Sequence, residues 1–176
     1  MNDQIKQNIV LVGFMGAGKT TVGKELAYRL NYKFMDTDYM IEEKTATTIN
    51  EIFRIHGEEY FRDLETSLLK ELTRDLTGTI LSTGGGIPVR EENIQIMRKL
   101  GYVVYLKLSR DTMIERLKGD TKRPLLKGYD LAERVDNLLK SREAYYRKAA
   151  HDIIISDNLS KEEIVDAILS GYKKLK

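Results

Sequence analysis

The most chemically specific stretch of the sequence is GFMGAGKTT, from Gly13 to Thr21. It matches the pattern G-x-x-x-x-G-K-[ST], follows the apolar run Ile9–Val12 and opens a segment of helical period. In such a loop the backbone N–H groups face phosphate, the lysine reaches the β- and γ-phosphates, and the threonine hydroxyl binds magnesium. The stretch predicts a nucleoside triphosphate site formed by Gly13, Gly16, Ala17, Gly18, Lys19, Thr20 and Thr21.

Two carboxylates follow the second apolar segment, in FMDTDYM. Ligands collect at the carboxyl ends of parallel strands, where Asp36 and Asp38 are expected. If both residues continue the strand, alternation places their side chains on the same side. One carboxylate can then support Mg²⁺, and the other can accept a hydrogen bond from a hydroxyl of the phosphoryl acceptor. A turn or helix-capping aspartate pair is the alternative that this stretch leaves open.

Two arginines are candidates for binding an acidic group. Arg62 stands in EYFRDLE, three residues before Glu65 and beside an apolar stripe of helical spacing. Arg142 stands in KSREAYYRK, on a charged helical segment. Each arginine also has a simpler interpretation, as a surface ion pair for Arg62 and as a solvated side chain for Arg142.

Two loops complete the set of candidate ligand-binding segments. Three consecutive glycines, Gly84–Gly86 in STGGGIP, follow the predicted strand Thr79–Ser82 and indicate close approach of the backbone to a ligand, with a plain turn as the alternative. A polar and basic stretch over about residues 118–130, KGDTKRPLLKGYD, has no periodicity. It is typical of a mobile lid that closes over phosphates and excludes water, or of a solvated surface loop.

The elements that must position these residues follow from the hydrophobic pattern. Short apolar runs alternate with longer segments of helical period, which predicts βαβ units and a parallel sheet covered on both faces. We expect the α/β class, as one three-layer α/β/α P-loop NTPase domain over residues 1–176. Thr48 with Glu51 and Ser160 with Glu163 have the spacing of helix capping boxes. The five candidate strands are Ile9–Val12, Lys33–Met35, Thr79–Ser82, Val103–Leu108 and Ile153–Ile155.

Composition narrows the kinds of partner. The 176 residues include 29 basic and 27 acidic side chains, a net charge of +2, which argues against a dedicated binder of nucleic acid or anionic membrane. There are no cysteines, so thiolate metal sites and cysteine nucleophiles are excluded. The polar N-terminus and the early glycines argue against a signal peptide or a membrane span, and we expect a cytoplasmic protein.

The P-loop by itself does not identify the phosphoryl acceptor, because kinases, GTPases and ATP-driven machines share it. A GTPase switch is one alternative. Asp75–Gly78 spells D-x-x-G, but it precedes the predicted strand at Thr79, whereas a magnesium-linked switch would follow a strand. The sequence also contains no N-K-x-D motif for reading guanine. These observations favour a small-molecule kinase.

Taken in order, the motifs GFMGAGKTT, DTD, FRxxE, TGGG and RPLL, with a late arginine followed by Tyr146, resemble the shikimate kinase family. The resemblance covers about residues 8–172. It implies transfer of a phosphoryl group from ATP to the 3-hydroxyl of shikimate, a step of chorismate and aromatic amino acid biosynthesis. It also implies a monomer that binds shikimate, ATP and Mg²⁺.

On the ATP side, the resemblance implies that Lys19 neutralises the transferring phosphoryl group. Thr20 would bind Mg²⁺, and Asp36 would support the ion. Arg116 would pack on adenine. Arg123, in the lid, would swing in and bridge the phosphate and the acceptor.

On the shikimate side, the resemblance places much of the site within about residues 36–65. Asp38 would bind the hydroxyls and orient the attacking one, and Glu65 would hold Arg62 in place. Lys19, Asp38 and Arg123 would be the catalytic residues. The residues implied to bind shikimate are Asp38, Arg62, Gly84, Gly85, Gly86 and Arg142.

Two other functions remain as alternatives. The first is another small-molecule P-loop kinase, acting on gluconate or a nucleoside monophosphate. A monophosphate acceptor would tolerate the arginines, but the DTD pair would face it unfavourably. The second is a nucleotide-binding regulator that has lost the chemistry, which is disfavoured because every catalytic position is occupied.

Overall fold

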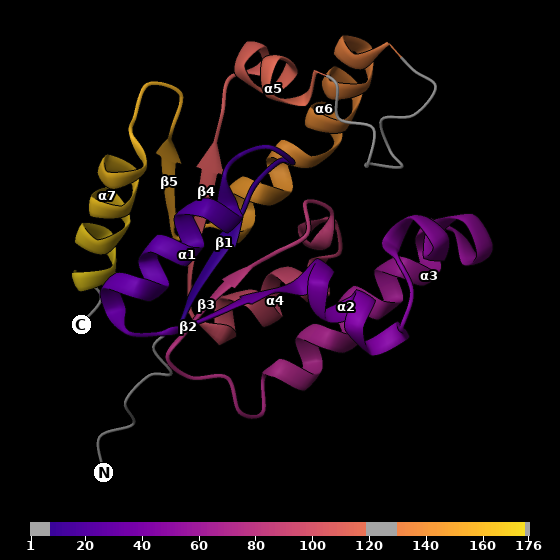
Figure 1. Cartoon of the computed structure of the whole chain (residues 1–176), viewed down its shortest axis with the longest axis horizontal. Helices are drawn as coiled ribbons and strands as arrows, with labels where there is room; N and C mark the ends of the chain where they lie inside the picture. The colour runs from indigo at the N-terminus through magenta and orange to yellow at the C-terminus, as the bar shows by residue number, and fades with distance from the viewer. Residues whose placement is uncertain (1–7, 119–129, 175–176) are drawn as a thin grey trace.

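Five parallel strands form a single sheet in the computed structural model, which describes residues 8–118 and 130–174. Across the sheet the strands follow the order β2-β3-β1-β4-β5. Figure 1 shows this sheet at the centre of the molecule, with helices on both of its sides. The strands are β1 (Ile9–Val12), β2 (Lys33–Asp36), β3 (Thr79–Ser82), β4 (Tyr102–Lys107) and β5 (Asp152–Ile155).

The helices cover the two faces of the sheet in two groups. Helices α1 and α7 pack against each other on one face, and α4 and α6 pack against each other on the opposite face (Figure 1). The helices are α1 (Lys19–Leu30), α2 (Thr37–Thr45), α3 (Ile49–Leu72), the 3₁₀ turn η1 (Ile87–Val89), α4 (Glu91–Leu100), α5 (Arg110–Leu117), α6 (Leu131–Ala149) and α7 (Lys161–Lys173).

A crevice opens beyond the carboxyl ends of β1 and β3. The two strands are neighbours, with Leu11 paired to Ser82. The chain leaves β1 through α1 toward β2, and it leaves β3 through α4 toward β4, on the other side of β1. Because parallel crossovers are right-handed, α1 and α4 cover opposite faces. Open α/β sheets bind ligands at such a switch point.

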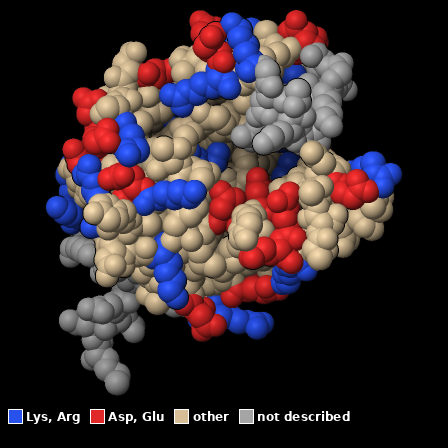
Figure 2. Space-filling model, viewed as in Figure 1, with Lys and Arg blue, Asp and Glu red and all other residues tan. Residues whose placement is uncertain are grey.

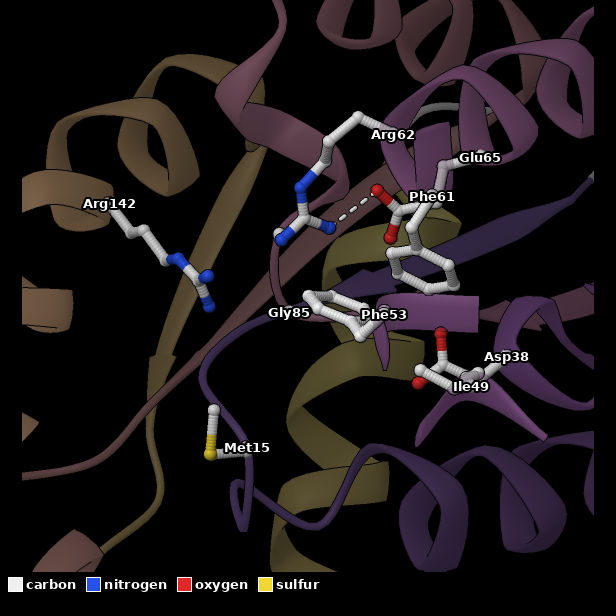
Figure 3. A pocket seen from close by; sticks show the side chains of 11 residues that line it. Met15, Asp38, Ile49, Phe53, Phe61, Arg62, Glu65, Gly85 and Arg142 are labelled. Atoms are coloured by element: carbon white, nitrogen blue, oxygen red, sulfur yellow. Dashed lines mark hydrogen bonds and ion pairs between the residues drawn. The ribbon is translucent and has the colours of Figure 1, made fainter. Parts of the chain in front are cut away.

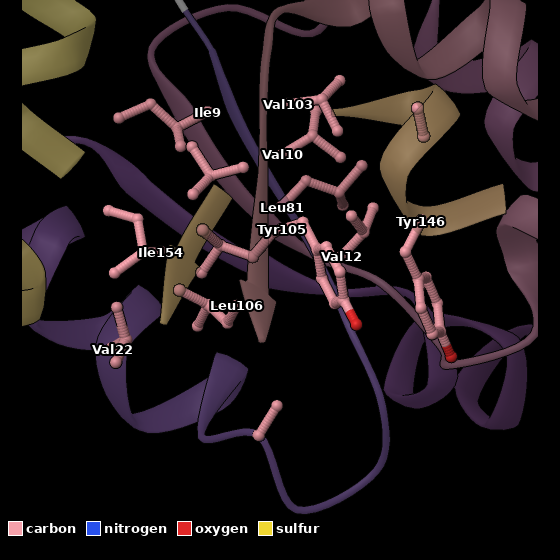
Figure 4. Close-up of a cluster of buried hydrophobic side chains, with 14 of the residues drawn as sticks. Ile9, Val10, Val12, Val22, Leu81, Val103, Tyr105, Leu106, Tyr146 and Ile154 are labelled. Atoms are coloured by element: carbon pink, nitrogen blue, oxygen red, sulfur yellow. The ribbon is translucent and has the colours of Figure 1, made fainter. Parts of the chain in front are cut away.

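The core forms where the sheet meets its helices. Strands β1 and β3 are buried at every position, which explains why β1 is a continuous apolar run and why β3 has two adjacent apolar residues at its centre instead of an alternating pattern. Figure 4 shows side chains of β1 and β4 packed together, with Tyr105 of β4 beside Tyr146 of α6. This core fixes the strand ends and therefore the loops that follow them.

The predicted α/β class and parallel five-stranded sheet are confirmed. β1 and β3 have the predicted bounds, and β2 and β5 are each one residue longer than predicted. β4 begins and ends one residue earlier than predicted, at Tyr102 and Lys107. The capping box of Ser160 and Glu163 is complete at the start of α7. At α3 Thr48 accepts from the backbone of Glu51, whose carboxylate pairs with Arg54 instead.

Helix α3 is interrupted at Gly57, whose φ of 82° lies outside the helical region. The kink brings the rings of Phe53 and Phe61 within 5.0 Å, centroid to centroid. In a continuous helix these residues would lie about 12 Å apart along the axis. The two aromatic rings can therefore line one pocket. No helix in the described part of the chain is long and apolar enough to cross a membrane.

Candidate active site

Two pockets adjoin at the crevice. The P-loop pocket is lined by Met15, Gly16, Gly18, Lys19, Thr20, Thr21, Asp36, Asp38, Ser82, Thr83, Gly84 and Gly85. The arginine pocket is lined by Met15, Asp38, Ile49, Phe53, Phe61, Arg62, Glu65, Gly84, Gly85, Gly86 and Arg142. Their shared lining residues are Met15, Asp38, Gly84 and Gly85. Groups bound in the two pockets would therefore lie next to each other, both in contact with these four residues.

The P-loop has the backbone that a phosphate cradle requires. Gly16 and Gly18 have φ values of 80° and 86°, in the left-handed region that favours glycine. Lys19 is buried, and its Nζ donates to the carbonyls of Gly13 and Phe14 at 2.8 and 3.0 Å. Gly13 and Ala17 are buried behind the pocket surface. The loop thus presents a cation and the start of α1 to the P-loop pocket.

The two aspartates do not continue one strand, so the strand-alternation prediction is wrong. β2 ends at Asp36, whose carboxylate caps α2 by accepting from the backbone N–H groups of Asp38 and Tyr39. Asp38 therefore lies in the first turn of a helix, because the cap turns the chain immediately after Asp36. Both side chains still line the P-loop pocket, and Asp38 also lines the arginine pocket.

A hydroxyl and a carboxylate meet at the start of α1. Thr20 Oγ1 donates to Asp36 Oδ2 at 3.3 Å, and both side chains line the P-loop pocket beside Lys19. Hard oxygen donors of this kind are the ligands that Mg²⁺ prefers. The residues present therefore fit a magnesium ion bound together with a phosphate.

Arg62 is a buried residue and not part of a surface ion pair. Its Nη1 donates to Glu65 Oε2 at 2.6 Å and its Nη2 to Glu58 Oε1 at 2.8 Å. Burial lowers the pKa of Arg62, but Glu65 and Glu58 outweigh it and raise that pKa above its ordinary value. The guanidinium is therefore held charged, and Figure 3 shows it in the arginine pocket beside Glu65.

Glu65 is completely buried, and its Oε1 has no hydrogen-bond partner among the described residues. Burial raises the pKa of Glu65 to about 7, with Arg62 opposing that rise and Asp38 adding to it. A carboxylate in this position balances the charge of Arg62. It also makes the pocket a place where hydrogen-bond donors are favoured.

Gly84 and Gly85 form part of the shared wall and Gly86 lines the arginine pocket beside it; we call these three residues the glycine wall. A Cβ on Gly84 would lie 2.5 Å from Asp38 Oδ1 and 2.9 Å from Glu65 Oε1, closer than real Cβ contacts. A Cβ on Gly86 would overlap the guanidinium of Arg62. Gly85 and Gly86 lie in a turn, and the three glycines also pack closely against side chains of both pockets. The approach of a ligand to this backbone stays a prediction.

Arg142 reaches the same pocket from α6, whereas Arg62 comes from α3 (Figure 3). It is 4% exposed, so the solvated interpretation of this arginine is wrong. Two arginines and two carboxylates thus converge from three helices. Planar guanidinium groups can each donate two hydrogen bonds to one carboxylate, which makes the pair suited to an acidic ligand.

Two of the three remaining residues of the predicted ATP site, Arg116 and Thr21, lie at the P-loop. Arg116, on α5, donates from Nη1 to the carbonyl of Gly16 at 3.0 Å, so it lies against the P-loop. Thr21 lies in the first turn of α1 and lines the P-loop pocket. Arg123 and most of the predicted lid lie outside the described residues.

Four apolar residues of the arginine pocket were not predicted from sequence. Met15 stands at a variable position of the P-loop, where its type gives no signal. Phe53 and Phe61 are eight residues apart, and only the kink at Gly57 brings them together with Ile49. Gly57 inside a helical pattern was the available signal, since an isolated glycine there lowers the expectation of a continuous helix.

Figure 2 shows a hollow near the middle of the face turned to the viewer. Basic side chains lie within the hollow, and acidic side chains gather along its lower edge. A site of this composition attracts an anion and also presents acceptors for hydroxyl groups. The arrangement suits transfer of a phosphoryl group to a ligand that carries both an acid and hydroxyls.

Comparisons with known proteins agree with this geometry. A family model described as shikimate kinase matches residues 15–173. A shikimate kinase of Caldanaerobacter subterraneus subsp. tengcongensis is 41% identical over 170 residues, which cover 97% of this chain and 98% of that protein.

The solved structures give the same result. The structure of shikimate kinase from Acinetobacter baumannii in complex with shikimate is 39% identical, with a TM-score of 0.91, and the match covers 97% of this chain and 94% of that one. A gluconokinase from Sinorhizobium meliloti 1021 has a TM-score of 0.60 at 16% identity, covering 97% of this chain and 94% of that one. The second likeness shows only a common fold.

Proposed function

The chain belongs to the shikimate kinase family. We propose that its P-loop pocket binds ATP and its arginine pocket binds shikimate. The residues that the two pockets share then hold ATP and shikimate close enough for direct transfer of the phosphoryl group. The protein is an enzyme that phosphorylates shikimate with ATP, a step of aromatic amino acid biosynthesis. The single observation that carries the residue assignments is that two adjoining pockets have four lining residues in common.

Arg62 and Arg142 bind the carboxylate of shikimate. They line the arginine pocket from two different helices, and the fork of each guanidinium matches a carboxylate. The backbone of Gly84, Gly85 and Gly86 lies against the substrate because these positions carry no side chains. The ring of Phe53 and that of Phe61 contact the apolar face of the substrate ring.

Asp38 orients the attacking hydroxyl at the boundary between the pockets. Phosphoryl transfer passes through a loose transition state, so positioning and charge neutralisation contribute more than proton abstraction. An aspartate with an ordinary pKa near 3.9 is a weak base at neutral pH, and orientation of the 3-hydroxyl requires no stronger one. The 3-hydroxyl donates a hydrogen bond to the carboxylate of Asp38. The carboxylate then receives the proton as the oxygen forms its bond to phosphorus.

On the donor side, Lys19 neutralises the charge of the transferring group, and the P-loop backbone holds the phosphates of ATP. Thr20 binds Mg²⁺ and Asp36 supports it, as their 3.3 Å contact and oxygen chemistry suggest. The bound ion supplies positive charge that stabilises the phosphates of the nucleotide. Arg116 packs on adenine, and Arg123 reaches the phosphates from the lid.

We propose that the working unit is a monomer, as the family resemblance implies. Size-exclusion chromatography with light scattering checks this, and activity restricted to a dimer fraction would contradict it. We place the enzyme in the cytoplasm, where ATP is available. Fractionation of the source cells checks the compartment.

The function is tested by measuring ATP turnover with shikimate, gluconate, AMP, CMP or no acceptor. We expect stimulation by shikimate alone, because gluconate lacks the ring that the phenylalanines contact and a nucleotide phosphate would face Asp38. Identification of the product by ³¹P NMR distinguishes the 3-phosphate from other esters. Equal turnover with any other acceptor would contradict the assignment.

A further inference from the structure

The hydroxyl of Tyr146 joins helix α6 to the wall that the two pockets share. Tyr146 is completely buried, and its hydroxyl donates to the carbonyl of Gly85 at 2.5 Å, across 61 positions of the sequence. Gly85 lines both pockets, whereas Tyr146 lines neither. The hydrogen bond therefore holds a residue of the pocket lining from a position outside both pockets.

Arg142 lies one helical turn before Tyr146, on the same side of α6. A Cβ placed on Gly85 would lie 3.6 Å from the Tyr146 hydroxyl and 3.7 Å from Arg142 Nη1. The same position lies 3.6 Å from the carbonyl of Gly13, which accepts from Lys19. Gly85 is thus the point at which α6, the glycine wall and the P-loop approach one another.

We propose that Tyr146 is a positioning residue for shikimate: its hydrogen bond to Gly85 fixes the distance between the glycine wall and Arg142, and thereby the carboxylate-binding half of the arginine pocket. The inference rests on the proposed function. Without the hydroxyl, the part-buried carbonyl of Gly85 loses its donor and the wall can move relative to α6. Burial raises the pKa of Tyr146 to about 12, so the phenol remains a donor at neutral pH.

The neighbouring ring of Tyr105 provides a matched control. Tyr105 and Tyr146 are both completely buried, with ring centroids 5.1 Å apart (Figure 4). The hydroxyl of Tyr105 has no hydrogen-bond partner among the described residues. Tyr105→Phe and Tyr146→Phe therefore make the same chemical change in the same pair of contacting rings, but only the second removes a hydrogen bond to a residue of the site.

The test is steady-state kinetics of both variants, with shikimate and ATP varied in turn and the Tm measured to check folding. For Tyr146→Phe we expect the KM for shikimate to rise about tenfold, the typical effect of one lost buried hydrogen bond. The KM for ATP and kcat should stay within about threefold, and Tyr105→Phe should match the wild type. A shikimate KM within about threefold of wild type, a parallel rise in both KM values, or an equal effect in Tyr105→Phe overturns the inference.

A second comparison keeps the test independent of folding losses. In an Arg142→Lys background the guanidinium fork that Tyr146 positions is already absent, so adding Tyr146→Phe should change the shikimate KM less than about threefold. If Tyr146→Phe still raises the KM for shikimate tenfold in the Arg142→Lys background, Tyr146 does not act by positioning Arg142, and the inference is overturned. Failure of the wild type to respond to shikimate would refute the proposed function itself and is a separate outcome.

Discussion

One turn of helix α3 carries both Arg62 and the buried carboxylate that holds it. Glu65 lies 2.6 Å from the guanidinium and is shielded from solvent, so the pair is unlike an exposed i,i+3 ion pair of small net effect. Removing one partner of such a pair leaves the other buried and uncompensated. We therefore expect Arg62 to serve both ligand binding and the balance of charge in the pocket.

Arg62→Ala should raise the KM for shikimate by at least about 30-fold, because truncating one partner of a buried charged contact weakens binding by several kcal/mol. The KM for ATP should change by less than about threefold, since Arg62 does not line the P-loop pocket. Steady-state kinetics with each substrate varied provides the measurement.

Arg90→Ala is the control for this prediction. Arg90 also pairs with carboxylates of α3, Asp63 and Glu59, but it lines neither pocket. The Arg90→Ala substitution should leave the KM values for shikimate and ATP near those of the wild type. Equal loss of shikimate and ATP affinity in Arg62→Ala would show that Arg62 acts on the fold and not on the acceptor.

Glu65 makes stability depend on pH with a defined sign. Its pKa is raised from 4.5 to about 7 in the folded protein, mainly by burial, so the folded state holds this proton more tightly than the unfolded chain does. Its contribution to stability is complete below pH 4.5 and is lost as the pH rises through about 7. The loss is of the order of 2–3 kcal/mol.

Urea unfolding of the wild type and of Glu65→Gln at pH 5 and pH 8 measures this effect. The free energy of unfolding of the wild type should fall relative to that of the variant between the two pH values. Parallel pH dependence in the two proteins would contradict a titration of Glu65 in this range.

At the scale of elements, the ends of helices determine where the side chains of the site are placed. Asp36 ends β2 and caps α2, which places Asp38 one residue into a helix. Gly18 precedes α1 with a left-handed backbone, which places Lys19 and Thr20 at the helix start. The site is therefore built from the ends of elements, whose positions depend on caps as much as on hydrophobic patterns.

The capping box of α7 gives a prediction at this scale. Ser160→Ala removes the side chain that accepts from the backbone of Glu163, which should lower the stability by about 1 kcal/mol and the Tm by about 2–4 °C. Thermal unfolding followed by circular dichroism provides the measurement. Ser141→Ala, an exposed mid-helix serine of α6, is the control and should not lower the Tm. Equal losses in the two variants would argue against a capping effect.

For the whole molecule, the order of the strands is what makes the two pockets adjoin. The loops after β1 and β3 meet because these strands are neighbours while their crossovers leave on opposite faces. Helix α6 then adds Arg142 from the far end of the chain. The two pockets thus share a wall but keep separate surfaces, which suits the proposed binding of ATP in one and shikimate in the other.

Lys19→Met should separate chemistry from acceptor binding. Lys19 lines the P-loop pocket and not the arginine pocket, so kcat should fall about 100- to 1,000-fold while the Kd for shikimate stays within about threefold. Single-turnover assays and isothermal titration with shikimate measure the two quantities. A variant that loses shikimate binding to the same extent would show that the pockets are not separable.

The sequence by itself determined the parallel α/β sheet, the P-loop and the identity of the charged residues, because these depend on local periodicity, on glycine backbone freedom and on short motifs. It did not determine that Arg62, Glu65 and Arg142 are buried, nor that Asp38 lies in the first turn of a helix. Those properties depend on a strand order that brings β1 beside β3, on the kink at Gly57 and on α6 packing against the glycine wall. Burial and convergence are produced by contacts between residues far apart in the chain, so only the tertiary structure could decide them.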